Sequence, residues 1–316
     1  MNSKPLRAAM TQTRNAYADM PETLDRLDLM HNRLVELREA NLAHHADLVA
    51  AAARQGAKLI GLGELFAGPY FALERRELWR GLAEDARTGP SVSAMRVVAR
   101  EHSMVIVAPI YELDPATGRR FNTAVVIDAD GSIAGKYRKV HIPVGTNETA
   151  TFDEGWYYER SDGALGNDPA RLVSDHPYFP VFRTVVGAIG VSICYDRHFE
   201  GVIAALARGG AQVILSPAVT FGSKSREMWK HEFVVDAMRH RVFLGGSNRS
   251  GAEAPWNVQF FGASRWHSPD GLLANLSDDP RLVIADLDLA SLAGPDPSGW
   301  NLARDARPDV YGERVT

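Results

Sequence analysis

Cysteine is almost absent from this 316-residue sequence, in which Cys194 is the single example. One cysteine cannot form an intrachain disulfide, so the hydrophobic core must stabilise the fold. A reducing cytoplasm is the natural setting for such a chain, and the N-terminal residues lack the long apolar segment that a signal peptide or a membrane span needs. We therefore expect a cytoplasmic protein.

Motifs for metals and nucleotides are missing as well. The ten histidines include the neighbours His44 and His45, which would point in different directions on a helix, and no HExxH or CxxC spacing occurs. Neither a P-loop nor a GxGxxG fingerprint is present. We expect no metal and no nucleotide cofactor.

An excess of basic residues is also lacking. The chain has 35 Lys and Arg against 39 Asp and Glu, a net charge of −4, which argues against nucleic acid or an anionic membrane as the main partner. Hydrophobic residues make up 45% and charged residues 23%, as is typical of a soluble globular protein. A small polar substrate is the partner class that stays open.

Hydrophobic periodicity predicts strands that alternate with helices. Strands are expected at residues 5–11, 57–64, 104–111, 187–194, 211–217, 243–247, 258–267 and 282–288, and helices at 24–55, 91–101, 200–208 and 225–240. Residues 121–143 indicate a hairpin around Asp130-Gly131. Residues 144–180 are the longest irregular stretch, and such loops are usually functional or mobile. The pattern predicts a layered α/β protein with a mixed sheet, formed as one domain over residues 1–316.

Three reactive side chains occupy comparable positions, at or just past the ends of predicted strands: Glu64, Lys139 and Cys194. Strand ends are where sites are assembled in open α/β sheets. A carboxylate beside a thiol can take its proton and later return it to a leaving amine, while an ammonium stabilises an oxyanion. Simpler alternatives are a small buried cysteine, a solvated or helix-capping glutamate and a lysine that reaches solvent.

The residues after Cys194 favour a reactive thiol. An apolar strand leads to the cysteine, and the four residues that follow are Tyr195, Asp196, Arg197 and His198. A thiol at this turn would be presented outward, near backbone amides that can stabilise a thiolate or an oxyanion.

Three segments resemble, in order, the signature blocks of the nitrilase superfamily of carbon–nitrogen hydrolases, which use a Glu-Lys-Cys triad: GELFAGPYF, GKYRKVHIP and GVSICYDRHFEG. The segments FDEGWYYE, GAQVILSPAVT and ARPDVYGE also resemble the family, so the resemblance spans almost the whole chain. It implies a four-layer αββα sandwich, an α/β fold with mixed β-sheets, which commonly dimerises into an αββα–αββα stack.

The resemblance also implies a homodimer or a larger homo-oligomer. ARPDVYGE and the tail before it are too polar to pack alone. We therefore expect the C-terminal extension from about residue 289 to form oligomer contacts.

The roles of individual residues follow from the resemblance by position. It implies that Glu64 is the general base, Lys139 the oxyanion stabiliser and Cys194 the nucleophile. The backbone amide of Tyr195 would complete the oxyanion hole. Glu154, in FDEGWYY, matches a second glutamate that orients the lysine and the substrate.

Within the superfamily, CYDRHFEG most resembles the branch that hydrolyses N-carbamoyl compounds, including β-ureidopropionase and N-carbamoyl amino acid amidohydrolases. That branch places an arginine at the position of Arg197, where the guanidinium holds the substrate carboxylate through two charge-assisted hydrogen bonds. Alternatively, Arg197 forms a buried ion pair with Asp196 or Glu200 that shapes the turn. Two residues of the signature segments, Tyr70 and His141, are further candidates for substrate binding.

These residues predict a cysteine-dependent hydrolase of a non-peptide carbon–nitrogen bond. We expect an N-carbamoyl amino acid amidohydrolase that releases amine, ammonia and carbon dioxide through a thioester intermediate. The loop after HIP lacks an arginine expected in close β-ureidopropionase relatives, so an aliphatic amidase or a nitrilase acting on a substrate without a carboxylate stays an alternative. A homologue that binds a ligand without catalysis is a more remote alternative.

Overall fold

Alternate residues of the strands face two different cores. In β1 (Leu6–Thr11), Ala8 and Met10 lie in a core between two sheets, whereas Ala9 lies in a second core beneath two helices. Successive side chains of a strand point to opposite faces, so a strand this apolar is buried on both. The computed structural model describes residues 4–311, and the residues outside this range include the end of the predicted contact extension.

The strands form two mixed sheets. The first has the order β17-β1-β2-β3-β4-β5 and the second β16-β15-β12-β11-β10-β9-β8. The first contains, besides β1, β2 (Leu59–Gly61), β3 (Val105–Leu113), β4 (Arg120–Ile127), β5 (Ile133–Arg138) and β17 (Leu282–Leu287). The second contains β8 (Leu172–Ser174), β9 (Val181–Thr184), β10 (Gly187–Val191), β11 (Val213–Ala218), β12 (Phe243–Asn248), β15 (Arg265–Ser268) and β16 (Gly271–Leu272). Strands β1, β2 and β3 are parallel, as are β10, β11 and β12, and the other pairs are antiparallel.

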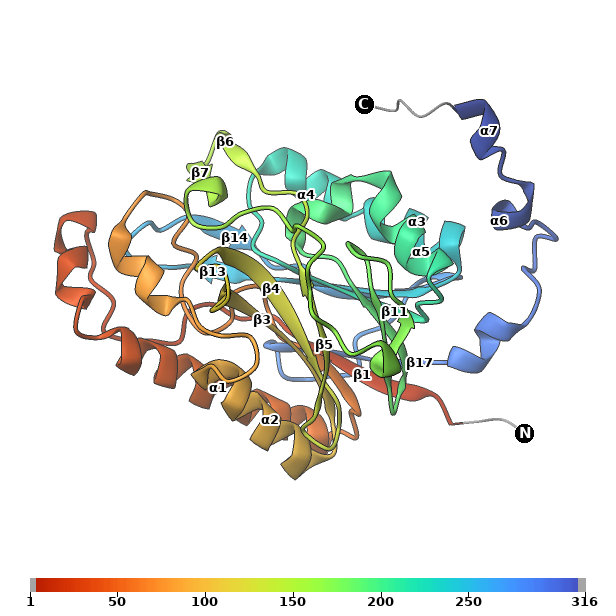
Figure 1. Cartoon of the computed structure of the whole chain (residues 1–316), viewed down its shortest axis with the longest axis horizontal. Helices are drawn as coiled ribbons and strands as arrows, with labels where there is room; N and C mark the ends of the chain where they lie inside the picture. Colours follow the sequence, from red (N-terminus) through yellow and green to blue (C-terminus); the bar gives the residue numbers. More distant parts are fainter. Residues whose placement is uncertain (1–3, 312–316) are drawn as a thin grey trace.

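Helices cover the outer faces of both sheets (Figure 1). The first sheet is covered by α1 (Leu34–Arg54) and α2 (Pro90–His102), and the second by α3 (Glu200–Arg208) and α5 (Glu232–His240). Together the layers are α, β, β and α, which confirms the predicted α/β sandwich with mixed sheets. No helix within residues 4–311 is long and apolar enough to cross a membrane.

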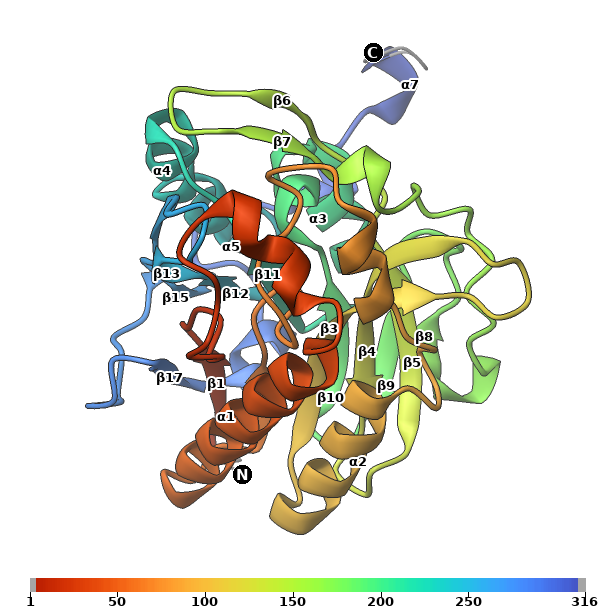
Figure 2. The same cartoon turned by 90° about the vertical axis from the view of Figure 1, so that its left-hand side faces the viewer.

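Shorter elements complete the fold. Two hairpins stand apart from the large sheets, β6 (Val144–Thr146) with β7 (Thr151–Asp153) and β13 (Ser250–Ala252) with β14 (Gln259–Phe261). Figure 2 shows hairpin β6–β7 projecting from the upper end of the molecule. The remaining elements are α4 (Ser223–Trp229), α6 (Leu302–Asp305), α7 (Pro308–Tyr311) and the 3-10 turns η1 (Leu24–Met30), η2 (Glu77–Leu82), η3 (Glu154–Trp156), η4 (Pro169–Arg171), η5 (Cys194–His198) and η6 (Leu289–Ala293).

The predicted helix over residues 24–55 is wrong in its first part. It divides into η1 and α1, because Leu27 and Met30 pack in one core cluster with Trp79, whereas Leu48 and Val49 face the first sheet. One straight helix cannot direct both hydrophobic stripes inward.

Two further predicted segments differ from the structure. The helix expected over 225–240 is split into α4 and α5, and Trp229 at the end of α4 donates its indole N–H to the Ala263 carbonyl at 2.8 Å. The stretch 144–180, predicted as irregular, contains the hairpin β6–β7 and the short strand β8.

Gly245 on β12 faces Met10 of the first sheet and Trp266 of the neighbouring strand β15. A β-carbon there would stand 2.7 Å from Met10 Sδ and 2.7 Å from the Trp266 ring. We expect Gly245→Ala to destabilise the fold by ~1–3 kcal/mol, because overpacking forces neighbouring groups to shift. The measurement is the thermal unfolding midpoint. Gly201→Ala, on an exposed position of α3 with open space around it, is the control and leaves the midpoint unchanged or slightly higher. Equal midpoints for the two variants would contradict the packing argument.

Candidate active site

The structure brings the three predicted reactive residues together. Glu64 follows β2, Lys139 follows β5 and Cys194 follows β10, so the two sheets both contribute. The Lys139 Nζ donates to Glu64 Oε1 at 3.0 Å. Val219 links the other two groups, because its carbonyl accepts from the Cys194 thiol at 3.5 Å and its amide donates to Glu64 Oε2 at 2.6 Å. All three side chains are buried.

Lys139 lies between two carboxylates. Its ammonium donates to Glu64 at 3.0 Å and to Glu154 Oε2 at 2.6 Å, with all three side chains almost fully buried. Burial by itself would lower the pKa of Lys139, but the charges of Glu154 and Glu64 outweigh it and raise that pKa above its ordinary value. The Lys139 ammonium therefore stays positively charged. Burial raises the pKa of Glu154, and the ammonium offsets this rise only in part.

Asn122 on β4 is a site residue that the sequence reasoning missed. Its side-chain Nδ2 donates to Glu64 Oε1 at 2.6 Å, and its backbone carbonyl accepts from the backbone amide of Lys139 at 2.8 Å. With the ammonium and the Val219 amide, it fixes the orientation of the Glu64 carboxylate. The sequence offered one signal, an amide side chain in the mostly apolar strand segment FNTAVVI. An amide that is buried in such a strand usually has a bonding partner.

The chain turns sharply at Cys194. Strand β10 ends at Val191, earlier than predicted, and Cys194 begins η5 with a φ of 52°. Few residues other than glycine adopt this left-handed conformation, and those that do cluster at functional sites. Arg197 holds the turn by donating its Nη1 to the Cys194 carbonyl at 2.7 Å.

The Cys194 side chain is only 6% exposed, so the prediction of an outwardly presented thiol is wrong. Instead the thiol borders a cavity of about 100 Å³ that is partly open to the surface. Burial raises its pKa to about 12, the Glu64 carboxylate contributes in the same direction, and the cations of Lys139 and Arg197 oppose both. The resting thiol is therefore protonated at neutral pH, and a nucleophile forms only when a base accepts this proton.

The cavity beside the thiol combines aromatic walls with a few polar groups. Its lining includes Tyr70, Glu154, Tyr195, Arg197 and Phe221. Tyr70 donates its hydroxyl to Glu154 Oε1 at 3.0 Å, and the ring of Tyr195 is 37% exposed. Such a mixture of apolar surface and a few convergent polar atoms is typical of a site for a small molecule.

Arg197 has a different partner from those predicted. Its Nε lies 3.3 Å from Glu232 Oε2 on α5, so the predicted alternative pairs with Asp196 or Glu200 are wrong. Its Nη2 donates to Thr220 Oγ1 at 3.3 Å, on the cavity wall. Glu232 comes from a helix that the local sequence cannot place beside this turn.

His141 lies beside the Cys194 turn and is not among the residues that line the cavity. Its Nδ1 lies 2.8 Å from Asp196 Oδ1, and its ring stacks on Phe199 with centroids 3.7 Å apart. Asp196 also accepts from the Ile193 amide at 3.0 Å and from the Tyr137 hydroxyl at 2.5 Å. This carboxylate thus ties the segment after Lys139 to the Cys194 turn. Within residues 4–311, no group of three or more His, Cys, Asp or Glu side chains is arranged to hold a metal ion.

Comparison with known proteins identifies the family. The family model described as carbon-nitrogen hydrolase matches residues 10–294. The chain is 32% identical to β-ureidopropionase of Arabidopsis thaliana, over 84% of this chain and 64% of that protein, which is just under two thirds of its length. It is 31% identical to N-carbamoylputrescine amidase of the same plant (87% and 90%) and 29% identical to citrullinase of Francisella tularensis (87% and 92%).

Solved structures agree with this assignment. A carbon–nitrogen hydrolase from Helicobacter pylori aligns over 98% of both chains with a TM-score of 0.78 and 25% identity. A member of branch 10 of the nitrilase superfamily from Saccharomyces cerevisiae shares the fold, with a TM-score of 0.69 over 99% of this chain and 98% of that one, at 21% identity. The fold and the matches define an enzyme of the nitrilase superfamily. The chain belongs to the carbon–nitrogen hydrolase family.

The environment of Cys194 generates a prediction about Glu64→Gln. Because the Glu64 charge raises the thiol pKa, its removal leaves the cations of Lys139 and Arg197 dominant and lowers that pKa. If Glu64 accepts the thiol proton during catalysis, we expect turnover to fall by ~100- to 10,000-fold in this variant. The measurement is the pH dependence of iodoacetamide alkylation, which reports one site because the chain has one cysteine.

In the parent protein the alkylation rate keeps rising past the ordinary thiol pKa of about 8.5, and in Glu64→Gln the curve moves to lower pH. Glu77→Gln makes the same change at an exposed carboxylate and serves as the control. A Glu64→Gln curve at the same or higher pH than that of the parent protein would refute the assignment of this carboxylate.

Proposed function

We propose that the protein hydrolyses the ureido carbon–nitrogen bond of a small N-carbamoyl amino acid, such as N-carbamoyl-β-alanine. The observation that carries the proposal is the guanidinium of Arg197, which borders the cavity with Nη1 only 3.9 Å from Cys194 Sγ. The relatives at about 30% identity support the reaction class, because β-ureidopropionase, N-carbamoylputrescine amidase and citrullinase are named for ureido compounds.

The charges around the cavity support an anionic substrate tail. Glu154 is the one carboxylate among the lining residues, and it is already bonded to Lys139 and Tyr70. A cationic tail would therefore meet Arg197 and find no free carboxylate on the wall. A carboxylate tail would instead complement the guanidinium.

The proposed reaction begins with proton transfer from Cys194 to Glu64. The thiolate attacks the ureido carbon, and the ammonium of Lys139 and the backbone amide of Tyr195 stabilise the resulting oxyanion. Glu64 returns the proton to the departing nitrogen, which leaves a thioester on Cys194.

Glu64 then deprotonates a water molecule, which hydrolyses the thioester and releases the thiol. The carbamate product breaks down, so the overall products are amine, ammonia and carbon dioxide. In this scheme Glu154, held by Tyr70, orients Lys139 and through it the oxyanion site.

A second candidate is an aliphatic amidase or nitrilase acting on a substrate without a carboxylate. One observation favours it: Arg197 already donates to the Cys194 carbonyl and to Thr220, and it pairs with Glu232. These contacts supply a structural role for the guanidinium without any substrate.

We also propose a cytoplasmic homo-oligomer, with the extension from about residue 289 in the contacts. The extension leaves the sandwich after β17 (Figure 1), and it carries apolar side chains that are exposed in the single chain, including Trp300 at 67%. A partner subunit would cover them.

The nucleophile and the oxyanion stabiliser are tested by Cys194→Ala and Lys139→Ala. We expect no turnover without the thiol, and a loss of ~100- to 1,000-fold or more without the ammonium. Ammonia release is measured from a panel of ureido acids, simple amides and nitriles. Full activity of Cys194→Ala on any of these substrates would exclude the thioester mechanism, whichever substrate is preferred.

Arg197→Gln tests the carboxylate clamp. Because Arg197 also holds the Cys194 turn, the informative quantity is the ratio of kcat/KM for N-carbamoyl-β-alanine to kcat/KM for propylurea, which lacks the carboxylate. We expect this ratio to fall by ~30-fold or more, since charge-assisted hydrogen bonds to the carboxylate are lost.

Thr220→Val is the matched control, because it removes a hydrogen bond of Arg197 while keeping its charge. It lowers both kcat/KM values alike. If Arg197→Gln also leaves the ratio unchanged, the substrate has no carboxylate at this position and the amidase alternative holds.

A further inference from the structure

Two strained turns carry the reactive groups. Cys194 and Leu65, the residue after Glu64, both have a φ of 52°. An L-residue in the left-handed region is strained, so it persists only where the surroundings determine it. Arg197 supplies this constraint at Cys194 by bonding its carbonyl.

A second buried arginine binds the turn that follows Glu64. Arg249 comes directly after β12, and its side chain is 5% exposed. Its Nη2 lies 3.1 Å from the Glu64 carbonyl, 3.0 Å from the Leu65 carbonyl and 2.7 Å from the Gly68 carbonyl. One nitrogen thus gathers three carbonyls of a single turn, which a planar guanidinium charge is suited to do.

Glu253 completes this arrangement. It pairs with Arg249 Nη1, and it accepts from the Asn15 amide at 2.6 Å and from the Tyr70 amide at 3.0 Å. The buried charges are therefore paired and hydrogen-bonded, as a stable buried ion pair requires. Because Tyr70 bonds Glu154, the pair also supports the second carboxylate of the site.

Asn248, the residue before Arg249, holds the segment that bonds the other oxygen of the Glu64 carboxylate. Asn248 accepts from the Thr220 amide at 2.9 Å and donates to its carbonyl at 3.3 Å. The neighbouring Val219 amide donates to Glu64 Oε2. Successive residues at the end of β12 thus hold both segments that meet at this carboxylate.

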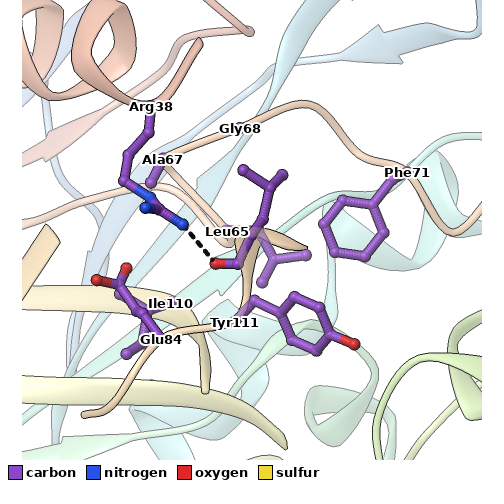
Figure 3. Close-up of a pocket in the computed structure, with 9 residues that line it drawn as sticks. Arg38, Leu65, Ala67, Gly68, Phe71, Glu84, Ile110 and Tyr111 are labelled. Carbon is purple, nitrogen blue, oxygen red and sulfur yellow. Dashed lines mark hydrogen bonds between the residues drawn. The ribbon is translucent and has the colours of Figure 1, made fainter. Parts of the chain in front are cut away.

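Packing leaves a space behind the turn. Figure 3 shows Leu65, Ala67 and Gly68 around a cavity of about 20 Å³, roughly the room for one water molecule. Arg38 also lines this cavity but donates to the Leu82 carbonyl at 3.0 Å. Packing is therefore incomplete on this side of the turn, and the carbonyl contacts of Arg249 add to the backbone hydrogen bonds of Phe66 and Gly68.

We propose that Arg249 is a positioning residue whose guanidinium fixes the turn from Glu64 to Gly68, so that the Glu64 carboxylate stays against Lys139 and Val219 beside the thiol. The inference rests on the proposed role of Glu64 as proton acceptor. It adds a residue from a distant part of the chain that touches no reacting atom.

Arg249→Met and Arg249→Lys test the proposal. Lysine keeps the charge for Glu253, but a single ammonium cannot also gather three carbonyls, so this variant keeps the test valid if Arg249→Met does not fold. The readout is the pH dependence of Cys194 alkylation by iodoacetamide, which requires no substrate. The charged and titratable groups around the thiol include Glu64, Lys139, Arg197 and Glu154, the hydroxyls of Tyr70 and Tyr158, and His198 on the cavity wall.

If the turn is released, the Glu64 charge moves away from the thiol, so alkylation shifts to lower pH, and turnover falls by about 100-fold. In the Glu64→Gln background, Arg249→Lys produces no additional shift, because the charge it positions is absent. Met95→Ala, a buried position on α2 away from the site, is the control that loses stability without a shift.

An alkylation curve that coincides with that of the parent protein overturns the proposal, whether or not turnover falls. A shift that persists unchanged in the Glu64→Gln background overturns it too. If the ureido substrate is not hydrolysed by the parent protein while the alkylation shift occurs, the proposed function fails and the positioning role stands.

Discussion

The buried ammonium of Lys139 is the interaction on which the rest of the site depends. A charge removed from water is costly unless it is paired and hydrogen-bonded, and here Glu64 and Glu154 supply that compensation from two different segments. Both carboxylates must be held in place, by Asn122 and Val219 for Glu64 and by Tyr70 for Glu154. The strand ends therefore converge to pair the buried charge of Lys139 as well as to fill the core.

The same burial sets the resting state of the nucleophile. Burial disfavours the thiolate form of Cys194 and raises the thiol pKa, and the nearby cations of Lys139 and Arg197 do not reverse this effect. In the proposed mechanism the thiol therefore needs Glu64 as its proton acceptor, and Lys139 stabilises the oxyanion that forms. The free protein therefore keeps a protonated thiol and not a reactive thiolate.

Arginines join the reactive turns to the surrounding fold. Arg197 bonds the carbonyl of Cys194 and, through Glu232, connects it to α5, whereas Arg249 bonds the turn after Glu64. Arg197 also borders the cavity. The guanidinium that holds the Cys194 turn is therefore the group best placed to contact the tail of the proposed substrate. If the carboxylate clamp operates as proposed, one guanidinium both holds the turn and selects the substrate.

The layered α/β class, most strand positions and the candidate residues Glu64, Lys139 and Cys194 could be predicted from the sequence, because alternation, turn residues and signature segments are local properties. The sequence could not separate η1 from α1, where two hydrophobic stripes face different cores. Nor could it find Asn122, Glu232 or Arg249, whose partners lie far along the chain. The burial of Cys194 and the convergence of its charged neighbours are visible only in the folded protein, because they depend on how the two sheets pack and which strand ends meet.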